Sequence, residues 1–321
     1  MKMQRLPSIA MAASVALLAA APLLAQSDYN QGQGKAVVTV LPASSGAAPA
    51  NISANQLALK INGKSTNIAN LTPLKNSNAP IQMVVMIDDG ARASLGIQLK
   101  DIAHFIATLP PNAQVTVAYM ENGRAALSGP LTTDHAAAVK ELHLPLTGEP
   151  GISASPYFCL SDLANHWPSD DRAVRRVVVM VTNGVDYYEV RYDPEDPYVQ
   201  AAITDAVRAR LTVYTIYWNG QGFFGRSGYA AMDGQNLMDQ LTQATGGNSY
   251  WIGFGNPVSF EPYFQNIDQR LGNQYEIGFV APLEGSKPGV ASMRLKASGT
   301  GGAKVVAPQQ VYVGHPAPGA E

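Results

Sequence analysis

The sequence predicts an α/β fold with a mostly parallel central sheet, helices on both faces, and short β segments at both ends. Met83–Ile87 and Val177–Val181 are continuous apolar runs, as expected for strands buried on both faces. Strand-like and helix-like patterns alternate over about 190 residues, which is typical of a parallel sheet. After residue 273 only strand-like patterns remain.

The elements of the central unit follow the first apolar run in order. Apolar residues at helical spacing lie between 95 and 109, and Pro110-Pro111 ends that helix. By the same criteria we expect further strands at 115–119, 211–217 and 249–252, and further helices at 135–142, 199–210, 236–245 and 260–271.

The two ends differ in composition from the centre. Residues 26–50 are rich in Gly, Ala, Ser and Pro and contain one apolar run, Val37–Leu41, which predicts a linker or an isolated edge strand. Alternation before Asn62-Gly63 predicts a β-hairpin. The expected organisation is a signal peptide at 1–25, the linker or edge strand at 26–50, an N-terminal β segment at 51–80, the α/β domain at 81–272, a C-terminal β segment at 273–315 and a tail at 316–321.

The N-terminal residues resemble a secretory signal peptide. A basic start, Met1–Arg5, precedes an uncharged apolar stretch, Ile9–Ala25. A retained membrane anchor is the alternative, but the stretch is short for a spanning helix and Pro22 interrupts it. We therefore expect cleavage near Ala25, no stable membrane span afterwards, and a periplasmic or extracellular protein.

Composition argues against several classes of function. The 22 Lys and Arg against 24 Asp and Glu give a net charge of −2, whereas nucleic-acid binding needs a basic face. The single cysteine, Cys159, excludes an internal disulfide. His166 follows it by seven residues, so a catalytic pair is conceivable, but a small buried side chain is the favoured interpretation. Gly220–Gly225 matches G-x-G-x-x-G without opening directly into a helix, which favours a surface loop over a nucleotide site.

Polar residues gather where the predicted strands end. Asp88 and Asp89 follow the first buried strand, Asn183 and Asp186 follow the central one, and Thr132-Thr133 lies between them in sequence. Loops at the carboxyl ends of parallel strands converge on a crevice, which is the usual ligand position.

These segments resemble the von Willebrand factor A (VWA) domain, and are most similar to bacterial secreted VWA-like proteins of the acidobacterial type. The resemblance covers residues 51–315 and is carried by the order and spacing of Met83–Asp88, Val179–Asp186 and Tyr214–Trp218. Asn273-Gln274-Tyr275 resembles the start of the β segment that follows the VWA unit in those proteins.

The resemblance implies a metal-ion-dependent adhesion site with the pattern Asp-x-Ser-x-Ser, a Thr from a middle loop and an Asp after the central strand. This sequence keeps Asp88 but has Gly90 and Arg92 in place of the serines and Asn183 in place of the aspartate. We expect a degenerate site with no metal and no other cofactor. A Mg²⁺ or Ca²⁺ ion, if bound, would take oxygen ligands from Asp88, Thr132 (or Thr133), Asn183 and Asp186.

Arg92 supports the expectation of a metal-free site, because a guanidinium cannot ligate a cation. If Arg92 points inward, it pairs with Asp88 or Asp89 and stabilises a metal-free loop. The alternative is that it points to solvent and the loop has no role.

Residues 186–198 hold four tyrosines and five carboxylates beside the expected crevice. Tyrosine is a common anchor in protein interfaces, and the carboxylates could hold Ca²⁺. The alternative is a solvated loop whose Asp-Pro pairs start turns and cap the next helix. The candidate partner-binding residues at this edge are Asp88, Asp89, Arg92, Thr132, Thr133, Asn183, Asp186, Tyr187, Tyr188 and Tyr192.

These observations and the resemblance predict a non-enzymatic module that binds a protein or glycan of the cell envelope. Two alternatives stay open. One is metal-dependent adhesion through a residual site, and the other is an enzyme that uses the crevice, although no spacing predicts an acid–base pair.

Overall fold

The computed structural model describes residues 30–44, 51–75, 79–88, 93–144, 151–182, 193–219, 228–254 and 258–315, with positions 184, 186, 188, 189 and 191. The expected signal peptide, the tail, Asp89, Arg92, Asn183, Tyr187, Tyr192 and the Gly220–Gly225 loop lie outside these residues. None of the described helices is long and apolar enough to cross a membrane.

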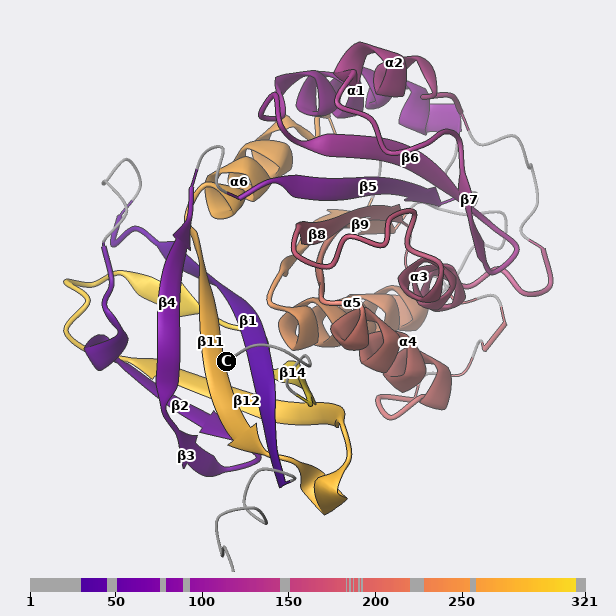
Figure 1. Ribbon diagram of the computed structural model, residues 1–321. Helices are drawn as coiled ribbons and strands as arrows, with labels where there is room; N and C mark the ends of the chain where they lie inside the picture. The colour runs from indigo at the N-terminus through magenta and orange to yellow at the C-terminus, as the bar shows by residue number, and fades with distance from the viewer. Residues whose placement is uncertain are drawn as a thin grey trace, which may run out of the picture.

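Two sheets organise the chain (Figure 1). The first is a six-stranded sheet in the order β10-β9-β8-β5-β6-β7, parallel except for its edge strand β7. Its strands are β5 (Ile81–Asp88), β6 (Gln114–Glu121), β7 (Arg124–Leu127), β8 (Arg175–Thr182), β9 (Leu211–Asn219) and β10 (Asn248–Phe254). The prediction of a parallel sheet with helices on both faces is confirmed for this unit.

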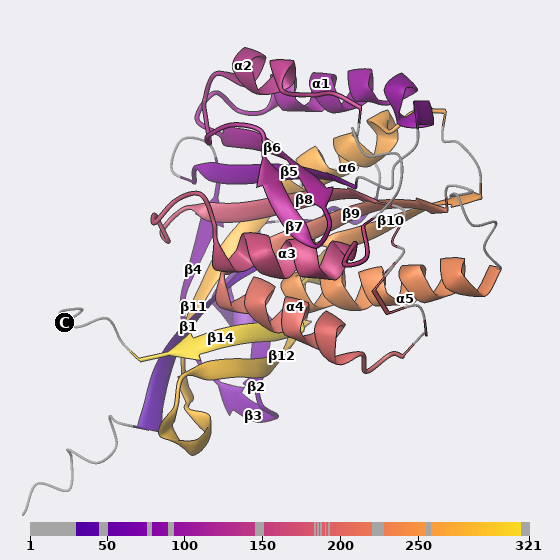
Figure 2. The same ribbon diagram turned by 90° about the vertical axis from the view of Figure 1, so that its right-hand side faces the viewer.

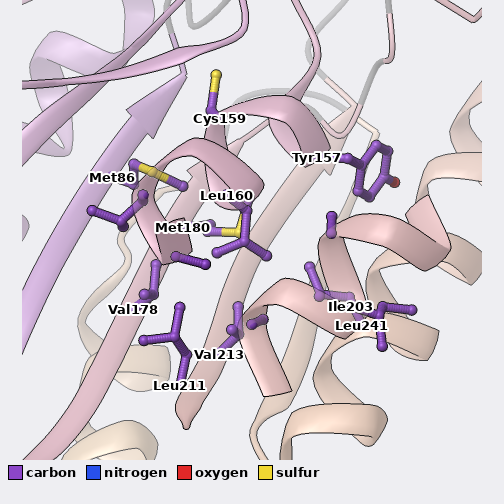
Figure 3. Close-up of a cluster of buried hydrophobic side chains, with 14 of the residues drawn as sticks. Met86, Tyr157, Cys159, Leu160, Val178, Met180, Ile203, Leu211, Val213 and Leu241 are labelled. Carbon is purple, nitrogen blue, oxygen red and sulfur yellow. The ribbon is translucent and has the colours of Figure 1, made fainter. Parts of the chain in front are cut away.

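Within the described residues, six α-helices cover the two faces of the parallel sheet, with α1, α2 and α6 on one side and α3, α4 and α5 on the other (Figure 1). They are α1 (Leu99–Thr108), α2 (His135–Lys140), α3 (Pro156–Asn165), α4 (Pro197–Arg208), α5 (Gly228–Thr245) and α6 (Glu261–Leu271). Alternate residues of β5 enter opposite cores: Met83 and Val85 face α1 and α6, whereas Val84 and Met86 face α3 and α4. Figure 3 shows Met86, Met180 and Leu160 meeting in the second core.

The second sheet is antiparallel, with the order β3-β2-β12-β14-β1-β11-β4 and β13 paired to β1. Its strands are β1 (Gln31–Leu41), β2 (Leu57–Ile61), β3 (Lys64–Thr66), β4 (Ile68–Leu74), β11 (Gln274–Pro282), β12 (Gly289–Ala297), β13 (Lys304–Val306) and β14 (Gln310–Gly314). The two flanking β segments therefore join into one domain with its own apolar core. β12 and β14 contact α4 of the parallel unit (Figure 2).

Two features of the β segments test the sequence interpretation. The hairpin of β2 and β3 is confirmed, since Asn62 and Gly63 both have positive φ, as a two-residue turn of this kind requires. The interpretation of residues 26–50 as a linker or edge strand is wrong for the strand that forms within the described residues 30–44. β1 lies inside the sheet, hydrogen-bonded along its length to β11 and on its other side to β13 and β14. Its apolar residues alternate with exposed ones, so one face joins the core.

One close approach in the parallel unit requires glycine. Gly247 lies where an added Cβ would be 1.8 Å from the carbonyl oxygen of Val213, so only glycine fits between α5 and β9. The helix α3 and the strands β4, β7 and β14 had no counterpart in the sequence interpretation. α3 begins where a Gly/Pro-rich stretch ends, and Ser155 and Pro156 are its capping and first residues.

Two buried tyrosines of the parallel unit differ in the hydrogen bonding of their hydroxyls: that of Tyr119 has partners and that of Tyr157 has none among the described residues. Tyr119 Oη donates to the carbonyl of His143 at 2.6 Å and accepts from its amide at 2.7 Å. Tyr157 Oη is buried without a hydrogen-bond partner among the described residues. Burial raises the pKa of Tyr157 well above its ordinary value, and the charge of Asp186 raises it further.

We predict that Tyr157→Phe keeps or raises the free energy of unfolding, by up to about 1 kcal/mol, because it removes an unsatisfied buried hydroxyl. Tyr119→Phe, the matched control, lowers it by about 1 kcal/mol or more. The pKa of Tyr157 is higher in the folded chain than in the unfolded chain. Above pH ~10 the unfolded chain therefore loses this proton more readily, which lowers the free energy of unfolding of the natural chain. Tyr157→Phe has no such proton, so its advantage in stability grows at alkaline pH. Urea unfolding at two pH values measures both effects, and a clear loss of stability in Tyr157→Phe would contradict the assignment.

Candidate functional site

The candidate site is the carboxyl edge of the parallel sheet, where β5 and β8 end side by side. Ile87 pairs with Val181, so Asp88 and Thr182 are the next residues on neighbouring strands. Both are buried. Thr182 Oγ1 donates to Asp88 Oδ2 at 2.5 Å and accepts from the amide of Gly184 at 2.9 Å. One hydroxyl thus joins the ends of both strands to the loop that follows β8.

Asp186 is the second carboxylate of this edge. Its Oδ2 accepts from Ser155 Oγ at 2.8 Å, and its Oδ1 accepts from the amides of Tyr188 at 2.8 Å and Glu189 at 3.1 Å. Burial raises the pKa of Asp186, while these hydrogen bonds act in the opposite direction. The carboxylate therefore fixes the loop after β8 to the start of α3.

Ser155 is a site residue that the sequence interpretation missed. Besides donating to Asp186, its hydroxyl accepts from the amide of Phe158 and caps α3. The available signal was the Ser-Pro pair before an apolar segment, which is typical of a helix start. Its side chain is 2% exposed.

Three aromatic rings meet above Asp186, and we refer to Phe158, Tyr188 and Tyr198 as the aromatic cluster. Their ring centroids lie 5.0 to 5.3 Å apart, in tilted or edge-to-face geometry. They come from the start of α3, the loop after β8 and the start of α4. Tyr188 and Tyr198 remain exposed, so the cluster presents apolar surface that is already ordered.

Other exposed apolar side chains lie at the same edge. Among the described residues, eight large apolar side chains are exposed. Four of them follow the carboxyl ends of β5, β8 and β10. Ile152 lies beside the end of β6, since the amide of Ser153 donates to Asn122. Ile152 and Val258 are 90% and 93% exposed. The six at this edge are Ile97, Leu144, Ile152, Tyr188, Tyr198 and Val258, with Leu144 placed here by its contact with Gly96 after β5.

The structure corrects the expected position of the middle-loop threonine. Thr132 forms a β-bridge with Val115, at the amino end of β6, whereas Asp88 pairs with Met120 near the carboxyl end. The five-residue offset places Thr132 about 16 Å from Asp88 along the sheet. Thr132 and Thr133 lie in the turn before α2, where Thr132 Oγ1 accepts from the amide of Asp134. Neither threonine belongs to the carboxyl edge.

The described residues do not assemble the oxygen ligands that the resemblance implies for a divalent cation. Thr132 is at the opposite edge, and the hydroxyl of Thr182 donates to Asp88. No group of three His, Cys, Asp or Glu within the described part of the chain is placed to hold a metal. Asp88, Asp186 and Tyr188 lie at the predicted edge, while Asp89, Arg92, Asn183, Tyr187 and Tyr192 lie outside the described residues.

No protein-family profile matches the sequence, and no curated protein is similar to it in sequence. Among solved structures, a human COPII-coat protein is 8% identical, with a TM-score of 0.45 over 74% of this chain and 44% of that chain. A mussel byssus thread matrix protein with a zinc-occupied adhesion motif is 14% identical, with a TM-score of 0.41 over 64% and 47%. The SpRpn10 VWA domain is 13% identical, with a TM-score of 0.38 over 60% and 97%.

This chain spans less than half the length of the first two proteins. At such identities and TM-scores, nothing that these proteins bind is carried over to this chain. The α/β unit is a doubly wound sheet with one antiparallel edge strand and helices on both faces, which is the architecture that the VWA resemblance implies. The narrower resemblance to acidobacterial-type proteins has no support in these comparisons.

We predict that Thr182→Val lowers the free energy of unfolding by about 2 kcal/mol, because Asp88 and the Gly184 amide both lose a buried partner. Thr215→Val is the matched control: this threonine is equally buried on the neighbouring strand, and its hydroxyl has no partner among the described residues. The control should be neutral or stabilising. Equal losses in both variants, measured by chemical denaturation, would show that the Thr182 contacts contribute nothing.

Proposed function

We propose that this chain is an exported, non-enzymatic, VWA-like module that binds a partner protein through the carboxyl edge of its parallel sheet without a divalent cation. The observation that carries the proposal is the concentration of exposed apolar side chains at this edge. Export rests on the signal-like pattern of Met1–Ala25. The partner is a protein of the envelope or of the surrounding medium.

The aromatic cluster has the properties of an interface anchor. Tyrosine buries a large area with little loss of side-chain entropy and keeps a polar tip for a hydrogen bond. Here, ring contacts with Phe158 hold both exposed tyrosines in place. The loop below is fixed by Asp186, so ordering it costs little when a partner binds.

Among the described residues of this edge, the polar groups are engaged in structural hydrogen bonds. Ser155 is buried and donates to a carboxylate, so it is not accessible as a nucleophile. Asp186 is occupied by three hydrogen bonds that hold the loop. These groups act as fixed structural supports beneath an apolar surface.

We predict that Tyr188→Ala combined with Tyr198→Ala abolishes capture of a partner from native envelope extract or culture medium, with little change in melting temperature. Both residues are exposed, so their loss removes binding surface and little core. Val280→Ala with Leu127→Ala is the matched control, since it removes two exposed apolar side chains away from this edge.

Three outcomes separate the possible functions. Unchanged capture by the double tyrosine variant would refute the proposed surface. Capture that is lost in EDTA would favour metal-dependent adhesion. A captured species that survives protease but not deglycosylation would show that the partner surface is a glycan.

A further inference from the structure

A cleft of about 240 Å³ lies between the two domains, at the amino ends of the parallel strands and far from the aromatic cluster. The antiparallel sheet contributes Lys35 from β1 and Glu276 from β11. The parallel unit contributes four arginines, Arg172, Arg175, Arg176 and Arg210. We refer to this space as the interdomain cleft.

The lining of the cleft is strongly cationic, although the chain as a whole has a net charge of −2. Five of its lining residues are cationic, and Glu276 is the only acidic one. Glu276 is already bound by Lys35, whose Nζ lies 2.8 Å from its Oε1. The four guanidinium groups therefore have no carboxylate of their own within the lining.

Two of the four arginines hold the fold together. Arg175 donates to the carbonyls of Leu271 and Ala79 and to the side chain of Gln274, which ties β8 to the segments that join the two domains. Arg176 donates to the carbonyls of Ser169 and Asp171. The Nε groups of both arginines are buried without an acceptor among the described residues.

Arg172 and Arg210 are different because both are exposed. No hydrogen bond or ion pair between described residues uses either guanidinium. Partial desolvation lowers the pKa of Arg210, Glu276 opposes this shift and Arg172 adds to it. Burial lowers the pKa of Arg176, Arg172 lowers it further, and Asp171 opposes the shift. The arginines are thus close enough to repel one another.

We propose that the interdomain cleft binds a small phosphate-bearing anion, with Arg172 and Arg210 as its direct ligands. A guanidinium presents paired N–H donors that match phosphate oxygens, and a doubly charged anion relieves the repulsion among the arginines. The cleft has room for inorganic phosphate or a small phosphate ester, and Tyr312 and Val207 supply apolar wall for the ester group.

Calorimetric titration of the full chain with inorganic phosphate and with a sugar phosphate, at constant ionic strength set by chloride, tests this proposal. We expect one saturable site for phosphate and a higher melting temperature in its presence. Arg172→Gln with Arg210→Gln should weaken binding at least tenfold and should not lower the melting temperature without phosphate, because it removes two mutually repelling charges. Lys64→Gln with Lys100→Gln removes the same charge elsewhere on the surface and should bind as the natural chain does. Tighter binding of the sugar phosphate identifies the ester as the ligand, and equal binding identifies phosphate itself.

Two results would overturn the proposal. One is the absence of saturable binding up to millimolar phosphate. The other is equal affinity in the two double variants, which would show that only overall charge matters. Citrate at the same ionic strength tests the chemical class, and binding of citrate without binding of phosphate would also contradict the assignment.

Discussion

The burial of β5 and β8 on both faces is the constraint on which the rest of the structure depends. Every residue of β5 is buried, and β8 is buried from Arg176 to Thr182. Two helical layers close the faces, so polar chemistry is confined to the strand ends. Asp88 and Thr182 mark one end and Gln82 and Arg176 the other. The fold therefore offers two edges, and these differ in chemistry.

The carboxyl edge combines exposed apolar rings with buried polar supports. Thr182 and Ser155 are each hydrogen-bonded to a carboxylate and to a backbone amide, so the loops are ordered by contacts below the surface. The side chains of the aromatic cluster form the exposed surface above these contacts. The amino edge is instead cationic, and there Arg175 connects the parallel unit to the antiparallel domain. An apolar surface suits a protein partner, whereas an arginine cleft suits a small anion.

Local pattern predicted most of the parallel unit because its strands and helices are set by continuous or periodic apolar residues. Local pattern failed to predict structure where pairing between strands far apart in the sequence determines the fold. Thr39 pairs with Gln274, and no local signal shows that an N-terminal glycine-rich segment completes a C-terminal sheet. Thr132 was placed at the wrong edge because sequence order does not tell at which end of a strand a loop finishes. Asp186 and Tyr188 could be predicted, since they directly follow a recognisable strand. Ser155 is harder to predict, because it follows a Gly/Pro-rich stretch and only its Ser-Pro pair marks the start of the helix.

The central claim is that the carboxyl edge recognises its partner through ordered aromatic surface and not through a bound divalent cation. Calorimetric titration of the full chain with Mg²⁺, Mn²⁺ and Ca²⁺ tests it most directly. We expect no saturable binding at micromolar concentrations for any of the three ions. Micromolar binding that disappears in Asp88→Ala would contradict it, because it would show that a metal site forms around the end of β5.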